Sequence, residues 1–345
     1  MSNSNIRIAV DRNIPFVKGL LDPYATVYYL SPEEMTPKFL REIDGLMIRT
    51  RNKCDRELLE KSAVKIIATA TIGTDHIDLD YCRQRTITVA NAPGCNAPAV
   101  GQYVFASILN LINRPLPQYT IGVVGVGHVG EIVARWADGF DMKVLRCDPF
   151  RQEAEGCDGW CDLDTIAREA DIITFHTPLT KSGPHPTYHM ADAAFFDKCR
   201  RAPIVINSAR GPVVDTQALI DAKKAGKVGA LVIDCWENEP EISRELLDLA
   251  SVATPHIAGY SREGKVRASQ MALDALTTFF ILPRVTVEGE PLPPVPARHV
   301  SKRDVMESYE PLKETAALKA HPEDFEAMRN GYNLRHEVSE GHDRL

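Results

Sequence analysis

Three polar residues, each following a separate apolar run, could together oxidise an alcohol. Arg210 lies in Asn-Ser-Ala-Arg-Gly, Glu239 in Asp-Cys-Trp-Glu-Asn-Glu-Pro, and His256 in Thr-Pro-His-Ile-Ala-Gly. Removal of hydride from a secondary alcohol requires a base for the hydroxyl proton, and a histidine suits that role near neutral pH. An arginine guanidinium can bind two carboxylate oxygens at once. We therefore predict His256 as the base and Arg210 as the substrate anchor, although each residue alone is also compatible with an ordinary loop position.

A glycine motif of the form GxGxxG indicates a dinucleotide site. It follows an apolar run at residues 121–124 and precedes a helix-forming stretch at 131–136. In that context the glycines allow a tight turn, close approach of the backbone to a pyrophosphate, and packing of the helix on the strand. The start of the helix then presents free N–H groups to the phosphates. The residues of this loop are Gly125, Gly127, His128, Val129 and Gly130.

Asp148 ends the next β run, about 20 residues beyond the glycines, where an acid is expected to bind the adenine ribose. Its carboxylate would accept a hydrogen bond from the 2′-hydroxyl and repel a 2′-phosphate, which favours NAD over NADP. Arg146 and Arg151 nearby temper that preference. The alternative is a glycine turn beside a solvated acid, which the strand, the spacing and the acid together disfavour.

Alternating β runs and helical stretches must position these residues. The β runs lie at 6–10, 26–29, 45–48, 65–69 and 86–90, and then at 121–124, 143–147, 172–176, 204–207, 231–234 and 252–254. Alternation of this kind predicts βαβ units and parallel sheets. We expect an α/β protein with two doubly wound parallel-sheet domains, the first flavodoxin-like and the second a Rossmann domain.

Two helical stretches, 99–112 and 268–282, lie where the chain could cross between the domains. We therefore expect a discontinuous substrate domain, formed by residues 1–95 and 258–283, and a nucleotide domain at 96–257. A cleft between the two would close and exclude water. Residues 284–345 begin with a proline-rich stretch at 291–296 and are expected to form a linker and a small C-terminal element.

The composition argues against several other classes of protein. No apolar run approaches the ~20 residues of a membrane span, and the net charge of −7 is unlike that of a general nucleic-acid binder. Eight cysteines spread along a long chain indicate reduced thiols, and Cys157 and Cys161 lack a second pair for a zinc site. No export signal is visible at residues 1–5. We expect a cytoplasmic protein without metal, membrane or nucleic acid.

The segments that contain Arg210, Glu239 and His256 resemble, in order and spacing, the signatures of the D-isomer-specific 2-hydroxyacid dehydrogenases. The resemblance implies that Glu239 fixes the tautomer of His256 and stabilises the imidazolium form, which completes a catalytic set with Arg210. It also implies NAD as cofactor. The NAD residues that it marks are Asp148, Thr177, Ser208, Ala209, Arg210, Asp234 and Gly259.

Further segments are similar to one branch of that family, which oxidises 4-phospho-D-erythronate at C2 in vitamin B6 synthesis. These segments are 10–15, 70–78, 92–97, 175–179 and 256–265, and a weaker similarity covers 325–337. The substrate is accordingly a phosphorylated 2-hydroxy acid. The substrate residues so implied are Thr50, Thr71, Gly73 and Tyr260. The branch also implies a homodimer, with residues 284–345 as the dimerisation element, although this segment is shorter than its counterpart in the branch.

A basic cluster, Arg49, Arg51 and Lys53, follows the third β run and could bind a terminal phosphate. An ordinary solvated basic loop explains the cluster equally well. Two rival functions also stay open. One is another D-2-hydroxyacid dehydrogenase, such as one that acts on phosphoglycerate, and the other is an NAD-sensing module like the corepressors that share this fold. The substrate-loop similarity around Thr50 and Thr71 favours an enzyme.

Overall fold

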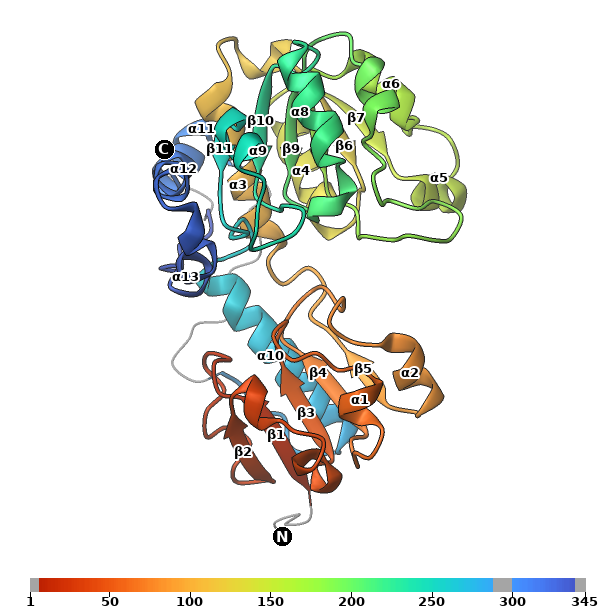
Figure 1. Ribbon diagram of the computed structural model, residues 1–345, viewed down its shortest axis with the longest axis vertical. Helices are drawn as coiled ribbons and strands as arrows, with labels where there is room; N and C mark the ends of the chain where they lie inside the picture. Colours follow the sequence, from red (N-terminus) through yellow and green to blue (C-terminus); the bar gives the residue numbers. More distant parts are fainter. Residues whose placement is uncertain (1–5, 288–299, 339–345) are drawn as a thin grey trace. The chain divides into compact units, whose positions relative to one another are not determined.

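The computed structural model describes residues 6–287 and 300–338 (Figure 1). By internal contacts the chain divides into two compact units, Met1–Asn96 with Arg262–Pro293, and Ala97–Ser261 with Pro294–Leu345. The chain leaves the second unit at Ser261, whereas the sequence suggested residue 257. The loop that holds Gly259 and Tyr260 therefore belongs to the second unit.

The first unit is built on a parallel sheet in the order β2-β1-β3-β4-β5. The strands are β1 Arg7–Asp11, β2 Thr26–Leu30, β3 Gly45–Ile48, β4 Ile66–Thr69 and β5 Thr88–Ala90. The direction of winding reverses between β1 and β3, as in flavodoxin-like sheets. This order confirms the fold predicted for the first domain.

Helices cover both faces of this sheet. Helices α1 (Arg56–Leu59) and α2 (Leu79–Gln84) bury their apolar residues on one face, and α10 (Arg262–Phe279) buries Leu273 and Leu276 on the other. Helix α10 begins earlier than the predicted 268–282. Its first turns are polar and charged, so the apolar pattern that marks a helix does not reveal its start.

The second unit is built on a six-stranded parallel sheet in the order β11-β10-β9-β8-β6-β7. The strands are β6 Thr120–Val124, β7 Lys143–Cys147, β8 Ile172–Phe175, β9 Ile204–Asn207, β10 Ala230–Ile233 and β11 Val252–Ala253. Winding reverses between β6 and β8, and ligands of such sheets bind beyond the strand carboxyl ends at this switch point. The sheet confirms the predicted second doubly wound domain.

Two layers of helices cover this second sheet (Figure 1). Helices α3 (Ala97–Leu111) and α4 (His128–Gly139) pack on one face. The helices on the other face are α6 (Leu163–Glu169), α7 (Ala193–Asp197), α8 (Thr216–Lys224) and α9 (Arg244–Leu249). Helix α5 (Pro149–Glu155) follows β7. In the described part of the chain, no helix combines the length and apolar character that a bilayer crossing needs.

The sequence suggested that the C-terminal residues form a separate element. In the structure they are part of the second unit. They form α11 (Lys302–Ser308), α12 (Pro311–Ala320) and α13 (Phe325–Asn330). Leu318 and Phe325 join the hydrophobic core on one face of the sheet, and Val305 joins the core on the other. These few apolar side chains are fully buried among charged neighbours, so composition alone concealed their role. The proline-rich stretch 291–296 lies outside the described residues.

Candidate active site

His256 and Glu239 form a hydrogen-bonded pair at the carboxyl end of the second sheet. His256 Nδ1 lies 2.8 Å from Glu239 Oε2 and 3.0 Å from Oε1, and the two side chains are only 26% and 17% exposed. Burial alone would raise the pKa of Glu239, but the hydrogen bond from His256 and the charges of His256 and Arg329 hold it below its ordinary value. An ionised carboxylate must accept, so Nδ1 carries a proton, and in the neutral form of the imidazole Nε2 then presents a lone pair. This is the arrangement of a general base.

The loop that carries His256 is held from beneath by a buried carboxylate. Asp234, at the end of β10, accepts hydrogen bonds from Thr254 Oγ1 (2.7 Å), Ile257 N (2.8 Å) and Ala258 N (3.0 Å). His256 has a φ of +57°, a left-handed conformation that the surrounding structure must enforce in a non-glycine residue. Burial raises the pKa of Asp234. Asp234, which the resemblance marked for NAD, thus also supports the loop of His256.

Arg210 lies on the neighbouring loop, after β9. Asn207 Nδ2 donates to Arg210 O (3.0 Å) and Gly211 O (3.3 Å), which fixes the turn. A Cβ at Gly211 would lie 1.9 Å from Trp236 O, so only glycine lets this loop approach the one that leads to Glu239. The second unit thus brings the loops of Arg210, Glu239 and His256 together, as the sequence predicted.

The glycine loop between β6 and α4 has the geometry of a phosphate-binding turn. Gly125 has a φ of +83°, and a Cβ at Gly130 would lie 2.0 Å from Gly125 O. A Cβ at Gly127, in contrast, would meet nothing within 4 Å. The turn itself thus requires glycine at positions 125 and 130. A pyrophosphate would fit the open space at Gly127 and the free N–H groups at the start of α4, which begins with His128 and Val129.

Asp148 links this loop to the end of β7. Its Oδ2 accepts from Val126 N (2.9 Å) and its Oδ1 caps helix α5 by accepting from Arg151 N (3.2 Å). Two nearby cations, Arg146 and Arg151, are paired with carboxylates: Arg146 with Asp138, and Arg151 with Glu131 and Glu155. These ion pairs reduce the attraction for a 2′-phosphate that the two arginines would otherwise provide.

Thr177 follows β8 next to the glycine loop, and Ser208 follows β9. The Ser208 hydroxyl is buried and has no hydrogen-bond partner within residues 6–287 and 300–338, so it calls for an external donor or acceptor. Thr177 lies against Gly125, where an added Cβ would approach Thr177 Cγ2 to 2.8 Å. An unpartnered hydroxyl, an open glycine and a helix N-terminus together fit a bound nucleotide. Ala209 and Gly259 lie in the adjoining loops.

In the first unit, Thr71 and Gly73 form a tight loop after β4. The Thr71 hydroxyl donates to Gly73 O (3.1 Å) and lies 2.6 Å from Thr69 Oγ1, which in turn lies 3.2 Å from His76 Nε2. Asn91 Nδ2 donates to Ile72 O (2.6 Å) and holds the loop from β5. The loop is ordered by its own side chains, as a site that presents backbone amides requires.

The basic residues of the predicted cluster after β3 have different partners. Arg49 Nε donates to Asp11 Oδ2 (2.9 Å), and Asp11 is fully buried, so Arg49 balances the charge of that acid. Lys53 is 81% exposed and pairs with Asp55 at 3.1 Å. Thr50 is exposed beside them. The pairing of Arg49 leaves less of its charge for a phosphate than the sequence suggested.

Two arginines that sequence analysis missed contact the catalytic loops from the C-terminal segment. Arg329 Nη1 lies 3.7 Å from Glu239 Oε2, and Arg329 Nε donates to the Tyr260 hydroxyl at 3.3 Å. Arg335 is buried and donates to the carbonyl oxygens of Ile257 (3.1 Å), Tyr260 (3.0 Å) and Ala258. The only signal in the sequence was the weak similarity over residues 325–337.

Cys235, Glu239 and His256 have potential metal-ligand atoms within 4.8 Å of one another. Burial raises the pKa of the Cys235 thiol well above its usual value, and the thiol donates to Ala209 O at 3.4 Å. A buried, protonated thiol is a poor metal ligand because the thiolate is the form that binds. The hydrogen-bonded pair is therefore better explained by proton transfer than by metal binding.

A glycine loop at the switch point of a parallel sheet, a carboxylate–histidine pair and an arginine on the adjacent loop define a nucleotide-dependent dehydrogenase of 2-hydroxy acids. Residues 104–258 match the family model of the D-isomer specific 2-hydroxyacid dehydrogenase, NAD binding domain. The fold is similar to that of D-lactate dehydrogenase from Aquifex aeolicus complexed with NAD and lactic acid. That similarity has a TM-score of 0.68 and 28% identity, and covers 80% of this chain and 95% of the other.

Relatives extend the match to nearly the full length. Erythronate-4-phosphate dehydrogenase from Bacteroides thetaiotaomicron is 46% identical, with 96% of this chain and 97% of the relative covered. The protein of the same name from Porphyromonas gingivalis is 42% identical, with 95% and 92% covered. This chain belongs to the erythronate-4-phosphate dehydrogenase family, and its cofactor is NAD, as the sequence predicted.

Proposed function

We propose that this protein oxidises 4-phospho-D-erythronate at C2 to (R)-3-hydroxy-2-oxo-4-phosphooxybutanoate, with reduction of NAD, in pyridoxal 5′-phosphate synthesis. The observation that carries the proposal is the His256–Glu239 pair, whose Nδ1 hydrogen bond leaves Nε2 available as a base. The near full-length similarity to erythronate-4-phosphate dehydrogenases supports the choice of substrate. Reaction class and substrate therefore rest on independent observations.

The reaction divides between two atoms of the substrate. His256 Nε2 removes the proton of the C2 hydroxyl, while the hydrogen on C2 departs as hydride and leaves a ketone. Bound NAD supplies the hydride acceptor. Glu239 stabilises the imidazolium that forms, because an ionised carboxylate lies directly against Nδ1. Arg210 binds the substrate carboxylate and the developing ketone oxygen through its planar guanidinium.

The glycine loop, Asp148, Thr177, Ser208, Ala209 and Gly259 hold NAD in this proposal, and Asp234 contributes by fixing the loop of His256. Thr50, Thr71, Gly73 and Tyr260 bind the substrate. Arg49 contributes to phosphate binding only with the donors that its pairing with Asp11 leaves over. We further propose a cytoplasmic homodimer with a contribution from residues 284–345, which light scattering after gel filtration would test by measuring the mass of the particle.

The experiment that tests the proposal follows NADH formation at 340 nm with 4-phosphoerythronate, 3-phosphoglycerate and D-lactate, with and without an added 2-oxo acid. We expect selective turnover of 4-phosphoerythronate and a loss of about 10²- to 10⁴-fold in His256→Ala. NAD binding, measured by calorimetry, should survive that substitution. Preferred turnover of 3-phosphoglycerate would favour a different dehydrogenase. NAD binding without turnover of any acid would favour the NAD-sensing alternative.

A further inference from the structure

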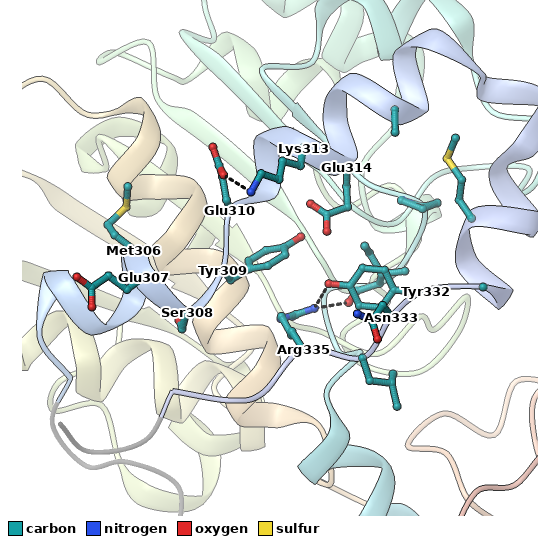
Figure 2. A pocket seen from close by; sticks show the side chains of 16 residues that line it. Met306, Glu307, Ser308, Tyr309, Glu310, Lys313, Glu314, Tyr332, Asn333 and Arg335 are labelled. Atoms are coloured by element: carbon teal, nitrogen blue, oxygen red, sulfur yellow. Dashed lines mark hydrogen bonds and ion pairs between the residues drawn. The ribbon is translucent and has the colours of Figure 1, made fainter. Parts of the chain in front are cut away.

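The loop of His256 is anchored from the C-terminal segment by Arg335, which Figure 2 shows at the wall of a cavity of about 640 Å³. Within the described residues, every hydrogen bond that Arg335 donates goes to that loop, to helix α3 or to Tyr332. The loops of Arg210 and Glu239 are therefore anchored by other residues.

His189, in the segment between β8 and α7, contacts both of these loops. Its ring Nε2 lies 2.7 Å from Glu237 Oε1, and its Nδ1 lies 3.2 Å from Asp215 Oδ2. Its main-chain N–H donates to Pro212 O at 2.7 Å, two residues after Arg210. One residue thus joins the segments that follow three adjacent strands of the sheet, β8, β9 and β10.

The imidazole of His189 is held in one orientation. The Tyr188 ring stacks on it, with the ring centroids 4.0 Å apart and the planes 16° apart. His189 also has a φ of +51°, a left-handed conformation that the surrounding structure must enforce in a non-glycine residue. Such enforced conformations cluster at functional sites, where they fix the direction of a side chain.

Glu237 connects His189 to the turn that carries Glu239. Its Oε1 accepts from His189, and its Oε2 accepts from Thr216 N at 3.0 Å. Burial alone would raise the pKa of Glu237, but the hydrogen bonds from His189 and Thr216 hold it below its ordinary value. The carboxylate is therefore ionised and can only accept, so Nε2 of His189 carries a proton. Glu239, two residues farther on, binds His256 instead.

We propose that His189 is a positioning residue, whose imidazole ties the loop of Arg210 to the turn of Glu239. The inference rests on the proposed function, in which Arg210 binds the substrate carboxylate and the His256–Glu239 pair removes the proton. A displacement of about 1 Å between groups that act on one substrate can cost about 10²-fold in rate. Loss of the imidazole should therefore lower turnover through Glu237 and Asp215.

Three replacements of His189 separate the ring from its nitrogens. Phenylalanine keeps a ring that can stack on Tyr188, glutamine places a donor near the position of Nε2, and asparagine places one near Nδ1. We expect His189→Phe to lower kcat about tenfold or more and to raise KM for 4-phosphoerythronate, with the affinity for NAD within about twofold. His189→Gln, which can still donate to Glu237, should recover most of the loss, whereas His189→Asn should not.

His185→Phe is the matched control, because His185 lies in the same segment and forms an equally short pair with Glu153 of α5, at 2.7 Å. At saturating NAD its kcat and KM should equal those of the wild type. Hydrogen–deuterium exchange gives a second readout that needs no turnover. The amides of residues 211–216 and 235–239 should exchange faster in His189→Phe but not in His185→Phe. Glu237→Gln keeps an oxygen that accepts from Nε2, so it should preserve the link.

Unchanged kcat and KM in His189→Phe would overturn the proposal, even with faster exchange, because the contacts of His189 would then be structural only. Equal activities of His189→Gln and His189→Asn would also overturn it, and this comparison decides the matter if His189→Phe does not fold. Absence of turnover in the wild type would instead refute the proposed function, and the positioning role with it. Wild-type turnover that survives in His189→Phe refutes the positioning role alone.

Discussion

Arg329 lies 3.7 Å from Glu239 in the folded protein, 90 positions away in the sequence, and links that carboxylate to the Tyr260 hydroxyl. The arginine is 17% exposed, as is its partner. Its charge is one of the causes that lower the pKa of Glu239. The C-terminal segment thus takes part in the electrostatics of the His256–Glu239 pair, which we propose to be catalytic.

Replacement of Arg329 by Leu should raise the pKa of Glu239, because a positive charge that favours the ionised carboxylate is lost. A carboxylate whose pKa is lowered in the folded protein stays ionised until the pH falls through that lowered value. In Arg329→Leu, protonation and loss of activity should therefore occur at higher pH. A profile of kcat/KM from pH 4.5 to 8 tests this, and the acid limb of the profile should move to higher pH in the variant. Arg303→Leu, at an exposed position of the same segment, should leave the profile unchanged. If Arg329→Leu has the same acid limb as Arg303→Leu, the role of Arg329 is refuted.

Glu239→Gln keeps the size of the side chain but removes the charge beside His256 Nδ1. An amide stabilises the imidazolium less than a carboxylate does, so kcat should fall about 10²-fold while the affinity for NAD stays within about twofold. Stopped-flow measurement of NADH formation separates these two quantities. Glu237→Gln is the matched control, since Glu237 lies two residues away and binds His189 at 2.7 Å instead. Equal losses of kcat in both variants would argue against the catalytic pair.

Asp148→Ala should remove two contacts: the cap of α5 and the hydrogen bond to Val126 N. We expect a loss of about 1 kcal/mol of stability from the cap, at least a fivefold weaker affinity for NAD, and a smaller preference for NAD over NADP. Asp162→Ala removes a similar cap from α6 but lies outside the glycine loop. Calorimetric titration with NAD and NADP should therefore show weaker NAD binding only for Asp148→Ala. Equal losses of NAD affinity in the two variants would show that Asp148 acts only as a helix cap.

The glycines at 127 and 130 should respond oppositely to alanine. In Gly130→Ala the new Cβ would lie 2.0 Å from Gly125 O, so the turn must distort and the melting temperature should drop. Gly127→Ala meets nothing within 4 Å, so the fold should stay intact while a bound pyrophosphate is obstructed. Thermal unfolding with and without NAD distinguishes the two. Full stabilisation of Gly127→Ala by NAD would contradict the assigned phosphate site.

Arg335→Met should destabilise the second unit and the catalytic loop together. The substitution leaves the carbonyl oxygens of Ile257, Ala258 and Tyr260 without this donor in a buried place. Removal of a buried, multiply bonded cation costs about 3 kcal/mol or more. Urea denaturation should show that loss, and Arg303→Met, from an exposed pair, should lose less than about 0.5 kcal/mol. Comparable midpoints would show that the segment is not anchored by Arg335.

The sequence by itself was sufficient for the two parallel sheets, the glycine loop and the loops of Arg210, Glu239 and His256. These features are encoded locally: β runs alternate with helices, glycines stand where a turn requires them, and reactive residues directly follow the strands. The carboxyl ends of parallel strands meet at one edge of a sheet. The order of strands along the chain therefore already implied that the loops after β9, β10 and β11 would be neighbours.

Tertiary structure alone decided the roles of residues whose partners are distant in the chain. Asp234 became a support for the loop of His256, and Arg49 became the counter-charge of Asp11. Arg329 and Arg335 reach the catalytic loops from a segment that the sequence suggested was a separate element. Burial and pairing depend on which side chains come into contact after folding, and a local pattern of residue types does not determine those contacts.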